Sequence, residues 1–216
     1  PIEEVFKGYT HMRFGTGLQV EAAKRLSHHS SWTALLGITD GMIYRDDRWW
    51  PLCAAYEAFC QRLGEAEKAL DTEASAFICG GGSMARAAIA ALFKCGYRAF
   101  RITTQSKAKS DELVEYMQRK FFGIDLEIVP IDKIVLLAGV SSIFINTLEE
   151  QDAMELEQEI SYLNFLKRPG AIIDTALYKE PTLLLKEATD SAIAITDGWS
   201  FAATCDAVWT GWAFGK

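Results

Sequence analysis

Three consecutive glycines, Gly80 to Gly82, stand between a short apolar stretch and an alanine-rich segment with helical spacing. In a strand–turn–helix unit, Gly80 permits a sharp reversal, Gly82 lets a pyrophosphate approach the backbone, and the small Ala85 lets the helix pack closely on the strand. The free N–H groups and positive dipole end of such a helix attract an anion. The stretch therefore predicts a dinucleotide-binding turn of the GxGxxA form; the alternative is a tight turn without a ligand.

A second stretch that bears on ligand chemistry is 104–109, directly after the next apolar run. Sites for NAD usually place a carboxylate here, about 20 residues beyond the glycines, to bind the ribose 2′-hydroxyl. No Asp or Glu stands at these positions, which weakens the case for NAD. Lys107 or Lys109 would instead help to hold a 2′-phosphate, so the predicted cofactor is NADP or none.

The elements that must position these residues alternate regularly from residue 74 onward. Apolar runs predict strands at 74–80, 97–104, 125–130, 141–147, 170–176 and 192–197. Helical periodicity predicts helices at 83–96, 106–122, 154–166, after Pro181 and at the C-terminus, and in the first third of the chain at 49–63. This alternation predicts an α/β fold: a Rossmann-like, doubly wound parallel sheet with helices on both faces and right-handed crossovers.

The composition limits the class of protein and of partner. A net charge of −7 with scattered Lys and Arg argues against direct nucleic-acid binding. No apolar run reaches about 18 residues, so no membrane span is expected. Five cysteines without a CxxC pair predict a reduced, intracellular compartment, cytoplasmic or nuclear, and no histidine stands near a cysteine pair, which disfavours a metal site.

Several motifs in order resemble the shikimate and quinate dehydrogenase family, especially the shikimate-dehydrogenase-like domain of fungal quinate repressors and multifunctional aromatic-pathway proteins. They are GGGSMARAAIAAL at 80–92, Thr104-Gln105-Ser106 in place of an Asn-Arg-Thr triplet, Ile145-Asn146-Thr147, DTALYKEP at 174–181 and WTG at 209–211. The resemblance implies a partial substrate-type α/β region at 1–72 and a nucleotide-binding domain at 73–216. It implies cofactor contacts at Gly80, Gly81, Gly82, Ser83, Met84, Ala85, Thr104, Gln105, Asn146 and Thr147, and substrate contacts at Thr39 and Tyr178.

The resemblance breaks where the family carries its chemistry. Reduction of a ring ketone needs a hydride donor and a positioned acid/base, which in that family is a Lys with an Asp partner. Ala55 stands at the position of the Asp, Cys53 and Thr39 stand at positions of substrate-binding Asn residues, and 13–18 contains no Lys. Arg13 stays protonated and is a poor acid/base. No catalytic residue is therefore assigned.

These breaks predict a non-catalytic domain that acts in regulation. The resemblance implies transcriptional repression of quinate use, through sensing of a pathway metabolite or contact with a protein partner or with other domains of a larger polypeptide. One alternative is an NADP-dependent shikimate or quinate dehydrogenase with a rebuilt relay, drawn from Lys24, His28, His29, Asp40, Asp46 and Asp47. Another is an assembly module in which Trp49, Trp50 and Trp212 form a contact surface.

Overall fold

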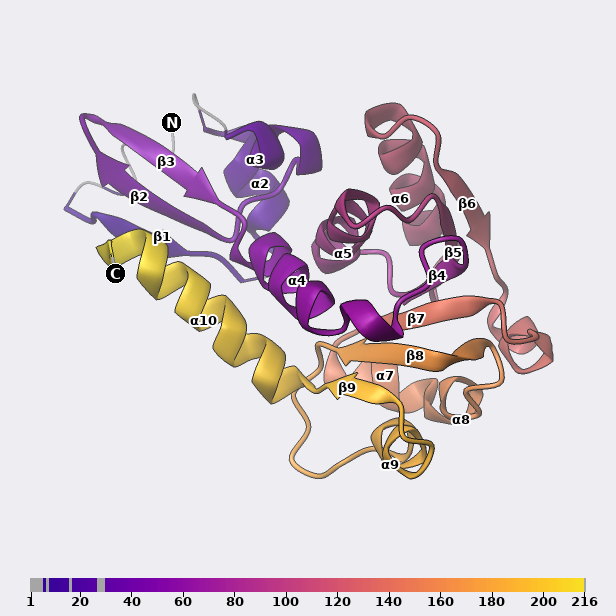
Figure 1. Cartoon of the computed structure of the whole chain (residues 1–216). Coiled ribbons are helices and arrows are strands. Elements are labelled where there is room, and N and C mark those ends of the chain that lie inside the picture. The colour runs from indigo at the N-terminus through magenta and orange to yellow at the C-terminus, as the bar shows by residue number, and fades with distance from the viewer. Residues whose placement is uncertain (1–5, 7, 16, 27–29, 216) are drawn as a thin grey trace.

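The computed structural model describes residues 6, 8–15, 17–26 and 30–215, which form a six-stranded and a three-stranded sheet (Figure 1). The larger sheet contains β4 (Ser75–Cys79), β5 (Ala99–Thr103), β6 (Asp125–Ile128), β7 (Ser141–Asn146), β8 (Leu166–Asp174) and β9 (Ala194–Thr196). All its pairings are parallel, in the order β6-β5-β4-β7-β8-β9. The chain runs outward from β4 to β6 and returns to β7 beside β4, which is the doubly wound dinucleotide-binding order. The predicted fold class is confirmed.

Helices cover both faces of this sheet because its central strands are apolar on both sides. One face packs against α4 (Ala54–Glu65), α5 (Ser83–Lys94), α6 (Lys107–Lys120) and α10 (Gly198–Phe214). The other packs against α7 (Glu150–Glu155), α8 (Glu157–Ser161), α9 (Leu183–Asp190) and the 3-10 segment Ile131–Leu136. Figure 1 shows these two layers above and below the strands.

The smaller sheet is antiparallel and contains β1 (His11–Arg13), β2 (Gly41–Arg45) and β3 (Arg48–Leu52). Helices α2 (Gln19–Lys24) and α3 (Ser31–Leu36) accompany it. Asp46 and Asp47 form the two-residue turn between β2 and β3, with φ of +52° and +58°. Two consecutive positive φ values match the type I′ turn that suits a two-residue hairpin, so these carboxylates belong to a turn.

Helix α10 joins the two sheets at the end of the chain (Figure 1). Its Phe201 ring lies 4.5 Å from that of Phe59 in α4, and its Phe214 ring stacks on His11 at 4.9 Å. The apolar core that contains Phe59 also includes residues of β4 and α5. Side chains from both sides of residue 72 therefore share one core, and the division of the chain at that position stays a prediction.

Two predicted helix ranges are wrong in part. The range 49–63 begins with most of β3, which pairs with β2. Because side chains alternate between the two faces of a strand, Trp49 is buried and Trp50 is exposed. The helix predicted at 154–166 ends at Ser161, since Leu163 has a φ of +52° and β8 begins at Leu166. In the first place an apolar run has the strand period, and in the second a residue in the left-handed region ends the helix.

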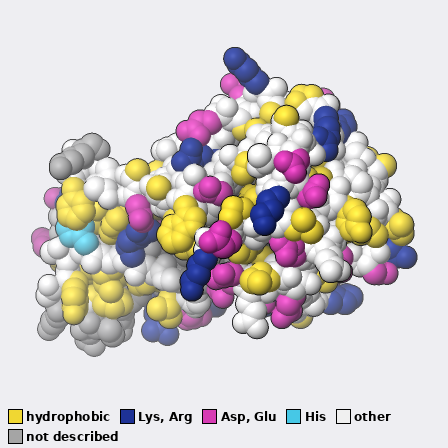
Figure 2. Space-filling view, turned by 90° about the horizontal axis from the view of Figure 1, so that it is seen from below, with side chains coloured by type: hydrophobic (Ala, Val, Ile, Leu, Met, Phe, Trp, Pro, Cys, Tyr) yellow, Lys and Arg dark blue, Asp and Glu magenta, His cyan; other side chains and the backbone are white. Residues whose placement is uncertain are grey.

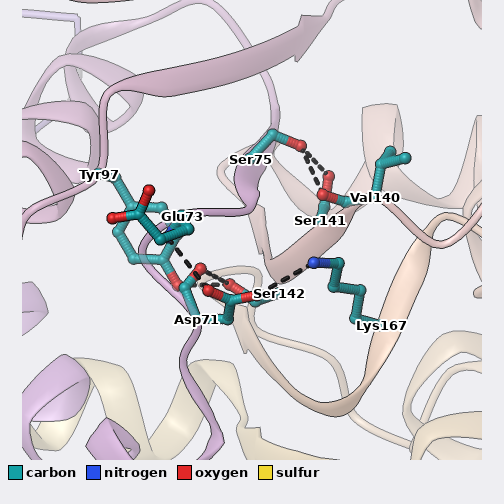
Figure 3. A network of polar contacts seen from close by, with 8 residues as sticks. All are labelled: Asp71, Glu73, Ser75, Tyr97, Val140, Ser141, Ser142 and Lys167. Atoms are coloured by element: carbon teal, nitrogen blue, oxygen red, sulfur yellow. Dashed lines mark hydrogen bonds and ion pairs between the residues drawn. The ribbon is translucent and has the colours of Figure 1, made fainter.

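A polar network ties the linker at Asp71 to the amino-terminal edge of the large sheet (Figure 3). Lys167 Nζ lies 3.0 Å from Asp71 Oδ2, and Ser142 Oγ donates to the Asp71 carbonyl at 2.8 Å. The Tyr97 hydroxyl lies 2.6 Å from Ser142 Oγ. These contacts are internal, so structural interactions occupy this edge of the sheet.

Figure 2 shows a face on which Lys and Arg side chains are interspersed with Asp and Glu. On this face the positive side chains are not gathered into one patch. Within the described part of the chain, no helix is both long and apolar enough to cross a bilayer.

Candidate nucleotide-binding site

A pocket of about 560 Å³ opens at the carboxyl ends of β4, β5 and β7, beside the switch point of the sheet. Its walls are the glycine loop and the start of α5, the turn from β5 into α6, and the turn from β7 into α7. The lining residues are Gly17, Gly80, Gly81, Gly82, Ser83, Met84, Thr104, Gln105, Ser106, Lys109, Thr147, Leu148, Glu149 and Asp152. Every predicted cofactor residue except Ala85 and Asn146 is among them.

The first two glycines are required by their surroundings. Gly80 has a φ of +120°, and a Cβ there would lie 2.2 Å from Thr147 Oγ1. A Cβ at Gly81 would lie 3.1 Å from Thr104 Cγ2 and from Lys109 Cβ. The glycine loop therefore brings the three walls of the pocket together.

Gly82 has a different role, because a Cβ there would meet nothing within 4 Å. It is the N-cap residue of α5, and no side chain caps this helix. The α5 N-terminus therefore presents backbone N–H groups and the positive dipole end to open space at the pocket, as an anion site requires. The residues present fit a diphosphate.

Ala85 and Asn146 lie behind the pocket. Ala85 is fully buried and packs α5 on the sheet, which is the role its small size predicts. Asn146 is fully buried at the end of β7: its Nδ2 donates to Asp174 Oδ1 at 3.0 Å and to the Tyr178 hydroxyl at 3.4 Å. Its Oδ1 accepts from the Leu148 N–H at 3.2 Å, which fixes the turn that forms one pocket wall.

Asp174, at the end of β8, is a buried carboxyl with only part of its hydrogen bonding satisfied. Oδ1 accepts from Asn146 and from the Ala176 N–H, both at 3.0 Å, whereas Oδ2 is buried and makes no hydrogen bond by distance and angle to the residues that the structure describes. Burial raises the pKa of Asp174 from 3.8 to about 6, against the lowering effect of these hydrogen bonds. The folded protein therefore keeps this carboxyl protonated up to a higher pH than the unfolded chain does.

This pKa shift predicts a pH-dependent contribution to stability. Because the folded pKa lies above the unfolded one, the contribution is present below about pH 4 and is lost as the pH rises through about 6. A difference of about two between the folded and unfolded pKa values corresponds to about 3 kcal/mol in the free energy of unfolding. We expect urea unfolding between pH 4 and 7 to show wild type losing stability relative to Asp174→Asn as the pH rises. A difference between the two proteins that does not change with pH would contradict the assignment.

The residues predicted to contact substrate do not line this pocket. The Thr39 hydroxyl is fully buried and lies 2.7 Å from the Gly41 carbonyl and 2.8 Å from that of Leu52. Tyr178 is 9 % exposed; its hydroxyl faces Asn146, and the residue lines a separate groove of about 450 Å³ beside α7 and α9. Burial also raises the pKa of Tyr178. Their roles toward a substrate stay predictions.

Asp40 and Lys24, two candidates for a rebuilt proton relay, are held by contacts elsewhere in the N-terminal region. Asp40 is 8 % exposed, and its two carboxylate oxygens accept from the Ala54 and Ala55 N–H groups at 2.7 Å each, so it caps α4. Burial is the main cause of its raised pKa. Lys24 pairs with Glu21 at 3.0 Å. His28 and His29 lie outside the described residues.

Sequence analysis missed part of the pocket. Gly17, Leu148, Glu149 and Asp152 line it but were not predicted. The signal available for the last three was their position just beyond the apolar run 141–146, since ligands in open α/β sheets bind outside the carboxyl ends of strands. No local pattern marks Gly17, which the N-terminal region brings to the pocket.

The fold and site together define a doubly wound dinucleotide-type protein with an added N-terminal sheet. Solved structures with this arrangement include the Mycobacterium tuberculosis shikimate dehydrogenase, at a TM-score of 0.80 and 14% identity over 99% of this chain and 78% of that one. The Corynebacterium glutamicum quinate dehydrogenase in complex with NAD gives 0.80 and 13%, over 97% and 74%. A Listeria monocytogenes shikimate 5-dehydrogenase in complex with shikimate and NAD gives 0.79 and 18%, over 99% and 76%.

No family model matches the sequence, and no curated protein matches it. Identities of this size establish a shared fold alone. The chain therefore has the fold of the shikimate and quinate dehydrogenases.

Proposed function

We propose that this protein binds a nicotinamide dinucleotide at the glycine loop and acts as a ligand-sensing or protein-contacting domain without turning over shikimate or quinate. The observation that carries the binding is the 560 Å³ pocket, in which an uncapped helix N-terminus meets open space at Gly82. The bound nicotinamide would supply a hydride in a dehydrogenase. Gly80, Gly81 and Gly82 would hold the diphosphate here, with Thr104 and Thr147 beside them.

The proposal of a non-catalytic role rests on the contacts that the polar groups of the N-terminal region already make. Ala55 stands where a carboxylate is expected, and its N–H is bonded to Asp40. The Thr39 hydroxyl and the two Asp40 oxygens are in contact with backbone groups of the N-terminal region. A proton relay needs a group within hydrogen-bond reach of the reacting atoms. In regulation of quinate use, the ligand would be a metabolite of that pathway.

A second candidate is an active shikimate or quinate dehydrogenase that uses NADP or NAD. The observation that favours it is the extent of the likeness: the fold shared with the dehydrogenases spans nearly the whole chain, including the small N-terminal sheet. Nucleotide binding is common to both candidates, so catalysis is the property that separates them.

Absorbance at the reduced-nicotinamide band separates the two candidates. We expect purified protein to show no change above background with shikimate or quinate and either oxidised cofactor, because Ala55 stands where the acid/base partner is expected and the described Asp40 carboxylate is held by backbone N–H groups. A parallel titration with NADH, followed by tryptophan and nicotinamide fluorescence, is expected to show saturable binding. Turnover that depends on protein concentration and disappears in Gly82→Asp would establish the dehydrogenase instead.

A further inference from the structure

Gln105 joins two walls of the pocket. It follows β5, and its Nε2 donates to the Asp152 carbonyl at 3.3 Å and to Glu155 Oε2 at 3.0 Å, both in α7. Strand β4 lies between β5 and β7 in the sheet, so a bridge from the turn after β5 to the helix after β7 crosses in front of the end of β4. A dinucleotide whose diphosphate lies at the glycine loop must place its adenosine ribose near this bridge.

The charges of the pocket are divided between its two ends. The glycine loop carries the α5 N-terminus and adjoins Lys109, whose Cβ would lie 3.1 Å from a Cβ at Gly81. The bridged end carries Asp152, which lines the pocket and accepts from Gln105 through its backbone carbonyl, and the Glu155 carboxylate, which holds Gln105. Glu149, at the start of the same turn into α7, also lines the pocket. Lys107, the other candidate for a 2′-phosphate, is paired with Asp111 at 2.8 Å and does not line the pocket.

We propose that Gln105, held by α7, is a specificity-determining residue that makes this site select a dinucleotide with a free ribose 2′-hydroxyl, of the NAD type, over one with a 2′-phosphate. This inference rests on the proposed nucleotide-binding function. The Gln105 side-chain oxygen can accept a hydrogen bond from a 2′-hydroxyl, which is the role a carboxylate has in other NAD sites. The 2′-phosphate of the other dinucleotide is an acceptor that carries more than one negative charge near pH 7. It would meet the acceptor oxygen of Gln105 and the carboxylates of Asp152 and Glu155.

The proposed preference for NAD is therefore opposite to the sequence prediction, which favours NADP. The sequence lacks a carboxylate after β5, but the fold places Asp152 of α7 in the pocket wall and the Glu155 carboxylate on Gln105. An exposed charge pair changes an affinity by about two- to fivefold. Two carboxylates facing a 2′-phosphate are thus expected to give a preference for NAD of roughly tenfold.

Isothermal titration of the full chain with NAD⁺ and with NADP⁺ tests this inference. At about 50 mM salt, where screening is weak, we expect NAD⁺ to bind roughly ten times more tightly. In the double variant Asp152→Asn, Glu155→Gln the ratio should fall to about threefold or less. Glu187→Gln is the matched control, since it removes one exposed carboxylate from α9 and lines no part of this pocket.

The outcomes are distinct. Equal or tighter binding of NADP⁺ by wild type would overturn the selectivity and leave nucleotide binding in place. An unchanged ratio in the folded double variant would overturn the assignment to this edge of the pocket. Absence of binding by NAD⁺, NADP⁺ and ADP-ribose would overturn both this inference and the proposed function. If the double variant does not fold, the wild-type ratio must shrink at about 0.5 M salt, since screening weakens repulsion between exposed charges; a salt-independent ratio rejects the inference.

Discussion

Replacing Gly82 with Asp is expected to weaken binding of NAD⁺ or ADP-ribose at least about 100-fold while leaving the protein as stable as wild type. A side chain at this position meets nothing within 4 Å, and the backbone has a φ of −90°, which any residue adopts. The new carboxylate would cap α5 and occupy the N–H groups that a diphosphate would use. It would also repel the phosphates: like charges about 4 Å apart near a surface interact by roughly 4 kcal/mol.

Gly82→Asn is the matched control, because Asn has nearly the same shape and also caps a helix but adds no charge. We expect it to lose about tenfold in affinity, and both variants to melt at or slightly above the wild-type temperature, since Asp and Asn are better N-caps than Gly by a few tenths of a kcal/mol. Calorimetric titration and thermal denaturation measure the two effects. Binding by the Asp variant within about threefold of wild type would refute the placement of the diphosphate.

Gly198→Ala is expected to destabilise the protein by about 3 kcal/mol or more, the largest loss of stability that we predict from one methyl group. Gly198 is the first residue of α10, and a Cβ there would lie 1.8 Å from the Ala176 carbonyl oxygen and 2.6 Å from its carbon. These are backbone atoms and cannot rotate away. Displacing Ala176 would also strain its N–H bond to Asp174.

Gly64→Ala is the control for this variant. Gly64 lies near the end of α4, where a Cβ meets nothing within 4 Å, so the substitution is expected to stabilise the protein by about 0.5 kcal/mol through helix propensity. In a chain of this size, a loss of about 3 kcal/mol corresponds to a melting temperature lowered by roughly 10 °C. If the Gly198→Ala and Gly64→Ala proteins melted within about two degrees of each other, the close approach of α10 to the segment after β8 would be refuted.

The sequence alone determined the parallel sheet and the glycine loop, because both are encoded locally. Strand and helix periods, together with the glycines after β4, specify a strand–turn–helix unit within about 20 residues. Thr104, Gln105 and Thr147, which the family resemblance implied as cofactor contacts, follow β5 and β7 and line the pocket.

Only the tertiary structure decided which polar groups meet. Gln105 reaches Glu155, 50 residues away, and Asn146 reaches Asp174, 28 residues away. Asp40 caps α4 across a hairpin, and α10 crosses to the small sheet. Such contacts depend on strand order, register and helix packing, which bring distant segments together. A local period carries no information about them, so the sequence determined the glycine loop, and the fold determined which polar groups line the pocket beside it.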